Sequence, residues 1–314
     1  MTGPTKAIVD EIKGLFMKKW ECRDLGPATS FLNMQIKHDG HKILIDQCSY
    51  LEKVLEHFGM QNARTAPTPL PQGYYPSKHL GSVDPELQSH FQQVIGSLLY
   101  IMLGTCPDVA YAVAALSQHA ANPSKEHLDK ALYICQYLLE TRHYSLVFDG
   151  ASQAGLIAYT DSDWASNHND RHSQTGWFFK LANCTFSWHS RKQECIAHSS
   201  TEAEYVSLSD CSRQAKWLWQ LLGELGYNLH PIPVCGDNQG SIFMASNPVT
   251  ETRSKHIDIK WHSIWELVSD KIIELFFIEG AQNPADMLMK NLGQIKFNLF
   301  RSQLGLVFYD HRHD

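Results

Sequence analysis

The order of apolar and polar residues predicts a β-hairpin and a short helix at the start of the chain. Residues 31–36 alternate apolar and polar positions, residues 38–40 (His-Asp-Gly) are typical of a turn, and the apolar residues 42–45 follow. Residues 50–58 then have the apolar spacing of a short helix, which we expect to end at Gly59.

A proline-rich stretch separates this first part from three helical patterns. Residues 62–85 contain five prolines and two glycines, which predicts a linker or a long surface loop. Apolar residues then recur at helical spacing over 85–103, 108–120 and 125–140. Asn122-Pro123-Ser124 supplies a helix stop followed by an N-cap, so we expect separate helices on either side of it.

The pattern changes at about residue 150. Residues 155–160 form a continuous apolar run of strand length, and residues 176–179 and 184–188 predict two further strands of a meander. The remaining predicted helices cover 201–225, 239–246, 256–269 and 284–292, and the remaining predicted strands cover 232–235 and 272–278. Three strands followed by alternating helices and strands predict a mixed sheet with helices on its faces.

Two acidic residues follow predicted strands. Asp161 comes directly after the apolar run 155–160, and Asp237 comes after 232–235, just before a helix. Ligand sites in α/β sheets form at the C-terminal ends of strands, so both positions suit a functional site. Taken alone, each acid is better explained as a turn or helix-cap residue.

The long predicted helix 201–225 gives two acids different roles. Ser199-Ser-Thr-Glu202 fits a capping box, which assigns Glu202 a structural role. Glu204 instead begins an apolar stripe on one helix face, continued by Leu208, Cys211, Ala215, Leu218 and Leu222. A carboxylate on a packed face is costly unless it is paired or binds a metal, so we favour Glu204 over Glu202 as the functional acid.

A fourth acid begins the last predicted helix. Asp286 follows Asn283 and Pro284, which suit the N-cap and the first helical position, and it could simply stabilise the helix dipole. If the strands that carry Asp161 and Asp237 are neighbours, however, all four acids could converge. Mg²⁺ prefers oxygen ligands, and a two-metal site holds its ions about 3.5–4 Å apart. We therefore predict that Asp161, Glu204, Asp237 and Asp286 are catalytic residues and ligands of two Mg²⁺ ions, with Mn²⁺ as a possible substitute.

Composition narrows the class of protein. At about one to two hundred residues per domain, 314 residues allow two or three compact units. The net charge of −6 argues mildly against a free-standing nucleic-acid binder, although a magnesium nuclease concentrates carboxylates at its centre. The sequence has no membrane-length apolar run, no signal-peptide pattern and no Cys-x-x-Cys pair. We expect an intracellular protein with reduced thiols, cytoplasmic and/or nuclear, with no membrane partner.

Seven blocks after residue 150 resemble the ribonuclease H domain of copia-type retrotransposon polyproteins. They are Tyr159-Thr-Asp-Ser-Asp-Trp-Ala165, Asp170-Arg-His-Ser-Gln-Thr-Gly176, Ser187-Trp-His-Ser-Arg-Lys-Gln193, Ser199-Ser-Thr-Glu-Ala-Glu-Tyr205, Gly236-Asp-Asn-Gln239, Lys255-His-Ile-Asp-Ile259 and Asn283-Pro-Ala-Asp286. Earlier residues resemble the end of the same elements' reverse transcriptase, through Asp24-Leu-Gly26, Phe58-Gly-Met60, Ile95-Gly-Ser-Leu-Leu-Tyr100 and Pro107-Asp-Val-Ala-Tyr-Ala-Val113.

The resemblance implies the fold class and the domain organisation. The class is α/β, with a ribonuclease H-like mixed five-stranded sheet and helices on both faces, preceded by an α+β remnant of a reverse-transcriptase palm and thumb. The expected units are 1–60 (end of the palm), 61–150 (thumb or connection-like helices), 151–292 (ribonuclease H domain) and 293–314 (C-terminal tail). The family's Tyr-x-Asp-Asp polymerase turn is absent, so DNA synthesis is not expected and the upstream reverse transcriptase region is a missing partner.

The resemblance also implies a function. In the family, the four acids hold metal ions that cleave the RNA strand of an RNA/DNA hybrid, and Asp163 is the rival of Asp161 for the first position. Possible substrate contacts are Arg171, Lys192, Asn238, Gln239, Lys255 and His256, with ordinary surface polarity as the alternative for the basic residues. The alternative function is a catalytically inactive remnant that only binds nucleic acid.

Overall fold

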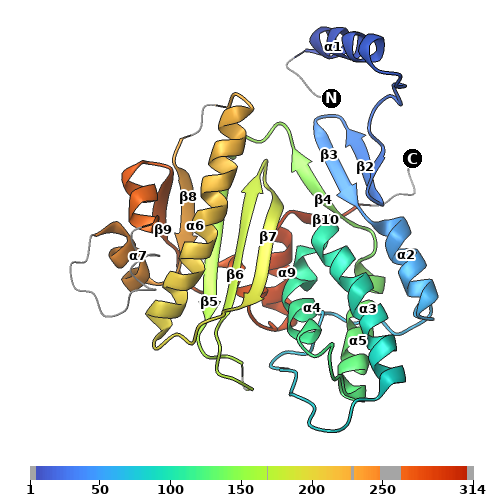
Figure 1. The fold of residues 1–314 in the computed structure, drawn as a ribbon, viewed down its shortest axis with the longest axis vertical. Helices are drawn as coiled ribbons and strands as arrows, with labels where there is room; N and C mark the ends of the chain where they lie inside the picture. The colour runs from blue at the N-terminus through green and yellow to red at the C-terminus, as the bar shows by residue number, and fades with distance from the viewer. Residues whose placement is uncertain (1–4, 168, 228–229, 248–262, 310–314) are drawn as a thin grey trace.

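The described chain forms two five-stranded β-sheets (Figure 1). The computed structural model describes residues 5–167, 169–227, 230–247 and 263–309. The strand order is β1-β2-β3-β4-β10 in the first sheet and β7-β6-β5-β8-β9 in the second. The first sheet therefore takes strands from both ends of the described chain, whereas the second is built from its later half.

The first sheet is antiparallel throughout. Its strands are β1 (Ser30–Phe31), β2 (Met34–Asp39), β3 (Lys42–Asp46), β4 (Tyr144–Asp149) and β10 (Leu306–Phe308). The predicted hairpin is confirmed as β2 and β3, and Gly40 provides the positive φ of +58° that their turn requires. Strand β4 pairs with β3 on one side and with β10 on the other, so a strand from near the C-terminus completes this sheet.

The helices between β3 and β4 in the chain lie where the apolar spacing predicts them. They are α2 (Cys48–His57), α3 (Pro85–Gly104), the 3₁₀ turn η1 (Pro107–Val109) with α4 (Ala110–Ser117), and α5 (Lys125–Thr141). The Ser124 hydroxyl accepts a hydrogen bond from the backbone N–H of His127, which confirms the predicted N-cap of α5. The fully described stretch between α2 and α3 contains no helix or strand, as its prolines predict.

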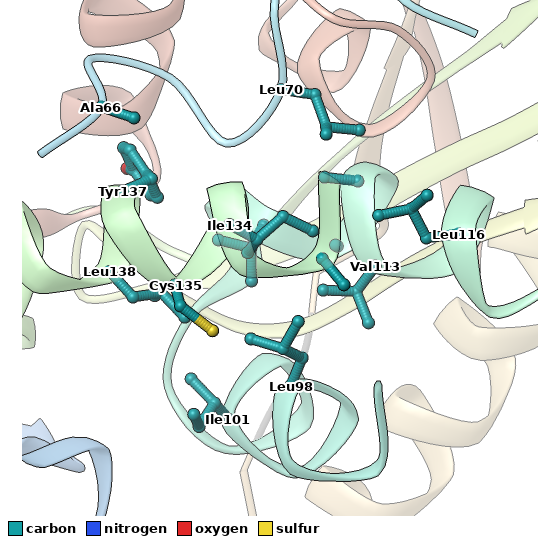
Figure 2. Close-up of a cluster of buried hydrophobic side chains, with 14 of the residues drawn as sticks. Ala66, Leu70, Leu98, Ile101, Val113, Leu116, Ile134, Cys135, Tyr137 and Leu138 are labelled. Atoms are coloured by element: carbon teal, nitrogen blue, oxygen red, sulfur yellow. The ribbon is translucent and has the colours of Figure 1, made fainter. Parts of the chain in front are cut away.

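The helices enclose the first hydrophobic core (Figure 2). Leu98 and Ile101 from α3 meet Ile134 and Leu138 from α5 there, all at most 1% exposed. The same core takes in side chains from the C-terminal segment, namely Ala285, Met287, Leu288, Leu292, Phe297, Phe300 and Leu304. Helix α9 (Gln294–Gln303), which carries two of these phenylalanines, is therefore built into the N-terminal half of the fold.

The second sheet is mixed. Its strands are β5 (Ile157–Asp163), β6 (Gln174–Leu181), β7 (Cys184–Lys192), β8 (Ile232–Gly236) and β9 (Ile273–Phe277). Strand β6 runs antiparallel to β5 and β7, while β8 runs parallel to β5 and β9. The predicted α/β class with a ribonuclease H-like mixed five-stranded sheet is confirmed.

Both faces of the second sheet are covered. Helix α6 (Ser200–Glu224) packs on one face, where Ala158 of β5 and Leu208 of α6 belong to a second core. On the other face, Tyr159 and Phe178 pack into the first core. Strand β5 is therefore buried on both sides, as its continuous apolar run predicts. Helix α7 (Gln239–Ser246) and the helical residues 263–269 contribute to the same second core as α6.

Two predicted elements differ from the structure in ways that bear on the acidic residues. Strand β5 does not end before Asp161 but continues to Asp163, because the antiparallel strand β6 extends the ladder and places Gly176 opposite Asp161. The predicted helix 284–292 is a 3₁₀ helix, η2 (Pro284–Leu288), a geometry that is common in short segments. Residues 256–262 of another predicted helix lie outside the described residues.

Helix α1 (Lys6–Lys19) lies apart from both sheets in Figure 1 and buries none of its residues. Its apolar side chains remain in solvent; Leu15, for example, is 60% exposed. Neither α1 nor any other described helix combines the length and apolar character needed to cross a membrane.

Candidate active site

Three of the four predicted acids meet at one end of the second sheet. Asp161 lies on β5, Asp237 directly follows β8, and Glu204 lies near the start of α6. One carboxylate oxygen from each lies within 4.8 Å of those of the other two. We call these three residues the acidic trio. Asp161 and Glu204 are only 4% and 8% exposed, so the trio brings at least two buried carboxylates together.

The fold explains why these three side chains converge. Strands β5 and β8 are parallel neighbours, with Tyr159 beside Cys235, so Asp161 and Asp237 emerge at the same end of the sheet. Helix α6 is attached to β5 through Ser207, whose hydroxyl donates a hydrogen bond of 2.8 Å to the backbone oxygen of Asp161. Ser207 lies about one helical turn after Glu204, and its contact holds the start of α6 against the strand.

The neighbouring polar residues take structural roles. The Ser199 hydroxyl accepts the backbone N–H of Glu202 at 3.1 Å, and the Glu202 carboxylate accepts that of His198 at 2.7 Å. This confirms the structural role predicted for Glu202. The N-cap of α7 is Asn238, which accepts the N–H of Ser241 at 2.9 Å. The alternative of Asp237 as the helix cap is therefore wrong, and its carboxylate belongs to the trio.

Asp286 lies next to the trio but is held differently. Its segment η2 is tied to β5 by Asn283, whose amide donates to the backbone oxygen of Thr160 at 3.0 Å and whose oxygen accepts the N–H of Ala285 at 3.2 Å. The carboxylate of Asp286 is 4% exposed and pairs with two ammonium groups, Lys290 at 2.6 Å and Lys296 at 2.7 Å.

The electrostatics of the site favour a cation. Burial, together with the charges of Glu204, Asp237 and Asp286, raises the pKa of Asp161 well above its usual value. Burial and the charge of Asp237 raise the pKa of Glu204 to about 8. Burial and the charge of Asp286 also raise the pKa of Asp237. Converging oxygen ligands that repel one another fit a hard divalent cation such as Mg²⁺, which would relieve the repulsion.

A glycine lets η2 approach the sheet. Gly176 lies opposite Asp161 on β6, and a Cβ atom at this position would lie 2.8 Å from Cβ of Leu288 and 2.9 Å from Cγ of Met289. Any side chain larger than hydrogen would therefore push η2, and Asp286 with it, away from the trio.

We expect Gly176→Ala to lower the free energy of unfolding by about 1–3 kcal/mol, because the added methyl group overpacks the contact with Leu288 and Met289. Denaturant unfolding measures this change. Gly155→Ala is the matched control, since no atom lies within 4 Å of a Cβ built at Gly155. Equal stability of the two variants would contradict the close packing of η2.

The predicted substrate contacts differ in their surroundings. Arg171 is exposed in the loop between β5 and β6, and Gln239 is exposed at the start of α7. Lys192 is ion-paired with Asp170 at 2.6 Å, and Asn238 caps α7. Lys255 and His256 lie outside the described residues. Asp163, the rival of Asp161, ends β5 and is not part of the trio.

The lysine partners of Asp286 were not predicted. Lys290 follows Asp286 by four residues, a spacing that allows side-chain contact in a helical segment, so a local signal for this pair existed. Lys296 lies on α9, and its contact with Asp286 depends on how α9 packs in the first core. Nothing in the local sequence indicates that second contact.

The chain is similar to plant retrotransposon Pol polyproteins over nearly its whole length. It is 36% identical over 313 residues to the Retrovirus-related Pol polyprotein from transposon TNT 1-94 of Nicotiana tabacum, covering 98% of this chain and 24% of that protein. It is 31% identical over 310 residues to the corresponding polyprotein from transposon RE1 of Arabidopsis thaliana, covering 98% and 21%. The chain thus spans no more than about a quarter of the length of these relatives. No protein-family model matches it.

Two solved structures are among those similar to the chain. One is a foamy viral protease-reverse transcriptase in complex with dsDNA, at 11% identity, covering 87% of this chain and 51% of that chain with a TM-score of 0.47. The other is LC11-RNase H1 in complex with an RNA/DNA hybrid, at 18% identity, covering 43% and 93% with a TM-score of 0.33. Sequence similarity along almost the entire chain shows that the protein belongs to the family of copia-type retrotransposon Pol polyproteins.

Proposed function

We propose that the chain cleaves the RNA strand of RNA/DNA hybrids by metal-assisted hydrolysis, as the nuclease part of a retrotransposon polyprotein. The observation that carries this proposal is the acidic trio, whose carboxylate oxygens converge within 4.8 Å at the end of a ribonuclease H-like sheet. Asp161, Glu204 and Asp237 would hold Mg²⁺, or Mn²⁺ in its place, and Asp286 is the proposed fourth ligand.

The chemistry follows from this ligand set. Two bound Mg²⁺ ions would supply an activated water and stabilise the leaving 3′ oxygen. The protein's contribution is to fix the carboxylates in place, through the contact of Ser207 with β5 and the contacts of Asn283 with β5 and η2. Because burial and the charge of Asp237 raise the pKa of Glu204 to about 8, Glu204 would give up a proton to hold a metal ion near neutral pH. The pKa of Asp161 is raised in the same direction by burial and the neighbouring carboxylates.

The proposed substrate is an RNA/DNA hybrid, which such enzymes distinguish through 2′-hydroxyl contacts across the wide minor groove. Arg171 and Gln239 have exposed side chains that can meet phosphates or sugars. Lys192 can do so only by leaving Asp170, and Asn238 only through the amide nitrogen that its capping role leaves available. The same proposal includes substrate contacts by Lys255 and His256. It also includes an upstream reverse transcriptase region as a partner.

The test compares two glutamates on the same helix turn. We expect the wild-type chain to cleave a labelled RNA/DNA hybrid in Mg²⁺ but not in EDTA, and to leave double-stranded DNA intact. Glu204→Gln should lower the cleavage rate by at least about a thousandfold, which corresponds to roughly 4 kcal/mol of transition-state stabilisation. Glu202→Gln should remain within a few-fold of wild type, because it perturbs only a helix cap worth about 1 kcal/mol.

The alternative function, a catalytically inactive remnant that only binds nucleic acid, predicts a different result. A remnant that only binds nucleic acid would bind the hybrid with an affinity that falls as salt rises, yet cleave nothing at any concentration of Mg²⁺ or Mn²⁺. That result with the folded wild-type chain would reject the nuclease proposal.

A further inference from the structure

Both oxygens of Asp286 are already occupied by cationic groups of the protein. Lys290 contacts one oxygen at 2.6 Å and Lys296 contacts the other at 2.7 Å. The Asp286 side chain is 4% exposed, whereas the two lysine side chains are 40% and 38% exposed. A buried carboxylate is thus covered by two ammonium groups that retain access to solvent.

The two lysines reach Asp286 from different elements. Lys290 follows the short helix η2, while Lys296 lies in the first turn of α9. The ammonium of Lys296 lies 5.1 Å from the ring centre of Phe300, and Phe300 is fully buried in the first core. Lys296 is therefore positioned by packing that is independent of the acidic trio.

The lysines also act on the trio itself. The charge of Lys290 interacts with Asp161 and Asp163, and the charges of both lysines interact with Asp237. Ammonium groups and divalent cations compete for the same carboxylate oxygens. Among the ion pairs of the described residues, no lysine ammonium pairs with a carboxylate of the trio. Both oxygens of Asp286, in contrast, pair with a lysine ammonium.

We propose that Lys290 and Lys296 control the binding of the second metal ion by occupying Asp286. The trio then binds one divalent ion in the absence of nucleic acid. Asp286 becomes a ligand only when Lys290 and Lys296 leave it, and phosphates of the bound hybrid are the acceptors for both ammonium groups. This proposal rests on the proposed nuclease function, which identifies the nucleic acid as an RNA/DNA hybrid. The predicted number of bound metal ions, however, does not depend on cleavage.

The first test measures the number of ions bound by the full chain without nucleic acid, using Mn²⁺ in isothermal titration calorimetry. We expect one ion for wild type and two for Lys290→Met with Lys296→Met, with the affinity for the second ion raised by about tenfold or more. Lys216→Met, at an exposed position of α6, is the matched control and should bind one ion. Two ions on wild type, or one on the double variant, would overturn the proposal.

A second measurement guards against misfolding of the double variant. Removing both ammonium groups leaves Asp286 buried without a partner, so metal should stabilise the double variant more than wild type. We expect the rise in melting temperature on adding Mn²⁺ to be larger for the double variant and intermediate for Lys290→Met alone. Equal rises in all three proteins would contradict the proposal, as would a larger rise in wild type.

Hybrid binding separates this proposal from the nuclease proposal. If Lys290 and Lys296 transfer to phosphates, the logarithmic dependence of hybrid affinity on salt should become shallower by about one for each lysine replaced. An unchanged salt dependence would remove the phosphate as acceptor. A chain that shows the one-to-two change in bound Mn²⁺ but cleaves no hybrid would support the lysine proposal and reject the nuclease.

Discussion

Asp161→Asn should abolish hybrid cleavage and at the same time stabilise the metal-free protein. We expect the Mg²⁺-dependent rate to fall by at least about a thousandfold, because the variant removes one of the three converging carboxylates that we propose as metal ligands. In EDTA, we expect the free energy of unfolding to rise by on the order of 2 kcal/mol, because one of the mutually repelling buried carboxylates is gone. Asn keeps an oxygen for the N–H of Ser162, which Asp161 accepts at 2.8 Å.

The stabilisation should depend on pH. Burial and neighbouring carboxylates raise the pKa of Asp161, and burial and Asp237 raise that of Glu204 to about 8. A carboxyl group whose pKa is higher in the folded than in the unfolded state contributes stability below its ordinary pKa, and this contribution is lost as pH rises through the folded value. Metal-free wild type should therefore lose stability between about pH 4 and pH 8. The gain from Asp161→Asn should be larger at pH 8 than at pH 5.

Thermal unfolding at these two pH values, in EDTA and in Mg²⁺, measures the effect. Mg²⁺ should stabilise wild type more than Asp161→Asn, since the ion replaces the repulsion by coordination. Asp163→Asn is the comparison on the same strand and should lose far less activity, because Asp163 is outside the trio. A larger loss in Asp163→Asn than in Asp161→Asn would reverse the assignment of the first ligand.

Ending the chain at Leu292 should prevent the N-terminal half from folding stably. The truncation removes α9 and β10 and takes Phe297, Phe300 and Leu304 out of the first core, where each is at most 4% exposed. Losing two buried phenylalanines and a leucine costs on the order of 10 kcal/mol, which matches the whole net stability of a typical domain.

The same truncation breaks a buried polar network. Arg301 donates to the hydroxyls of Tyr137 and Tyr144, each at 3.1 Å, and Tyr137 donates to the buried carboxylate of Asp108. The truncation removes the positive charge of Arg301, which favours the ionised form of Asp108 against the cost of its burial.

Circular dichroism and limited proteolysis of the chain ending at Leu292 test this prediction. We expect reduced helix content and rapid cleavage within residues 48–141. A chain ending at Tyr309 retains α9 and β10 and is the control, expected to match the full chain. A chain ending at Leu292 that resists proteolysis like the control would show that α9 is dispensable.

Local sequence patterns were sufficient to predict the helices and strands whose buried faces match the spacing of their own apolar residues. The apolar run of β5 and the stripe of α6 predicted elements that the structure contains, because both are packed along one or two complete faces. Strands β4 and β10 were not predicted. Each is held by pairing partners from distant parts of the sequence, which no local pattern encodes.

The site divides in the same way. Asp161, Asp237 and Glu204 were predicted from their places at strand ends and on a helix face, and the structure brings them together. The state of Asp286 could not be predicted, because Lys296 reaches it through the packing of α9 in another core. Asn238 was expected to contact substrate, but a helix N-terminus also needs a cap, and its oxygen serves that need.

Strand β10 has a consequence for the chain during its synthesis. Strands β2, β3 and β4 leave the ribosome before β10, so the outer edge of β4 stays open until Leu306–Phe308 has been translated and has emerged. At about 5–20 residues per second, the interval between the end of β4 and the end of β10 is roughly 8 to 30 s. For that time the nascent polypeptide displays an unpaired strand beside an unfinished apolar interior, a natural target for chaperones and for association with neighbouring copies.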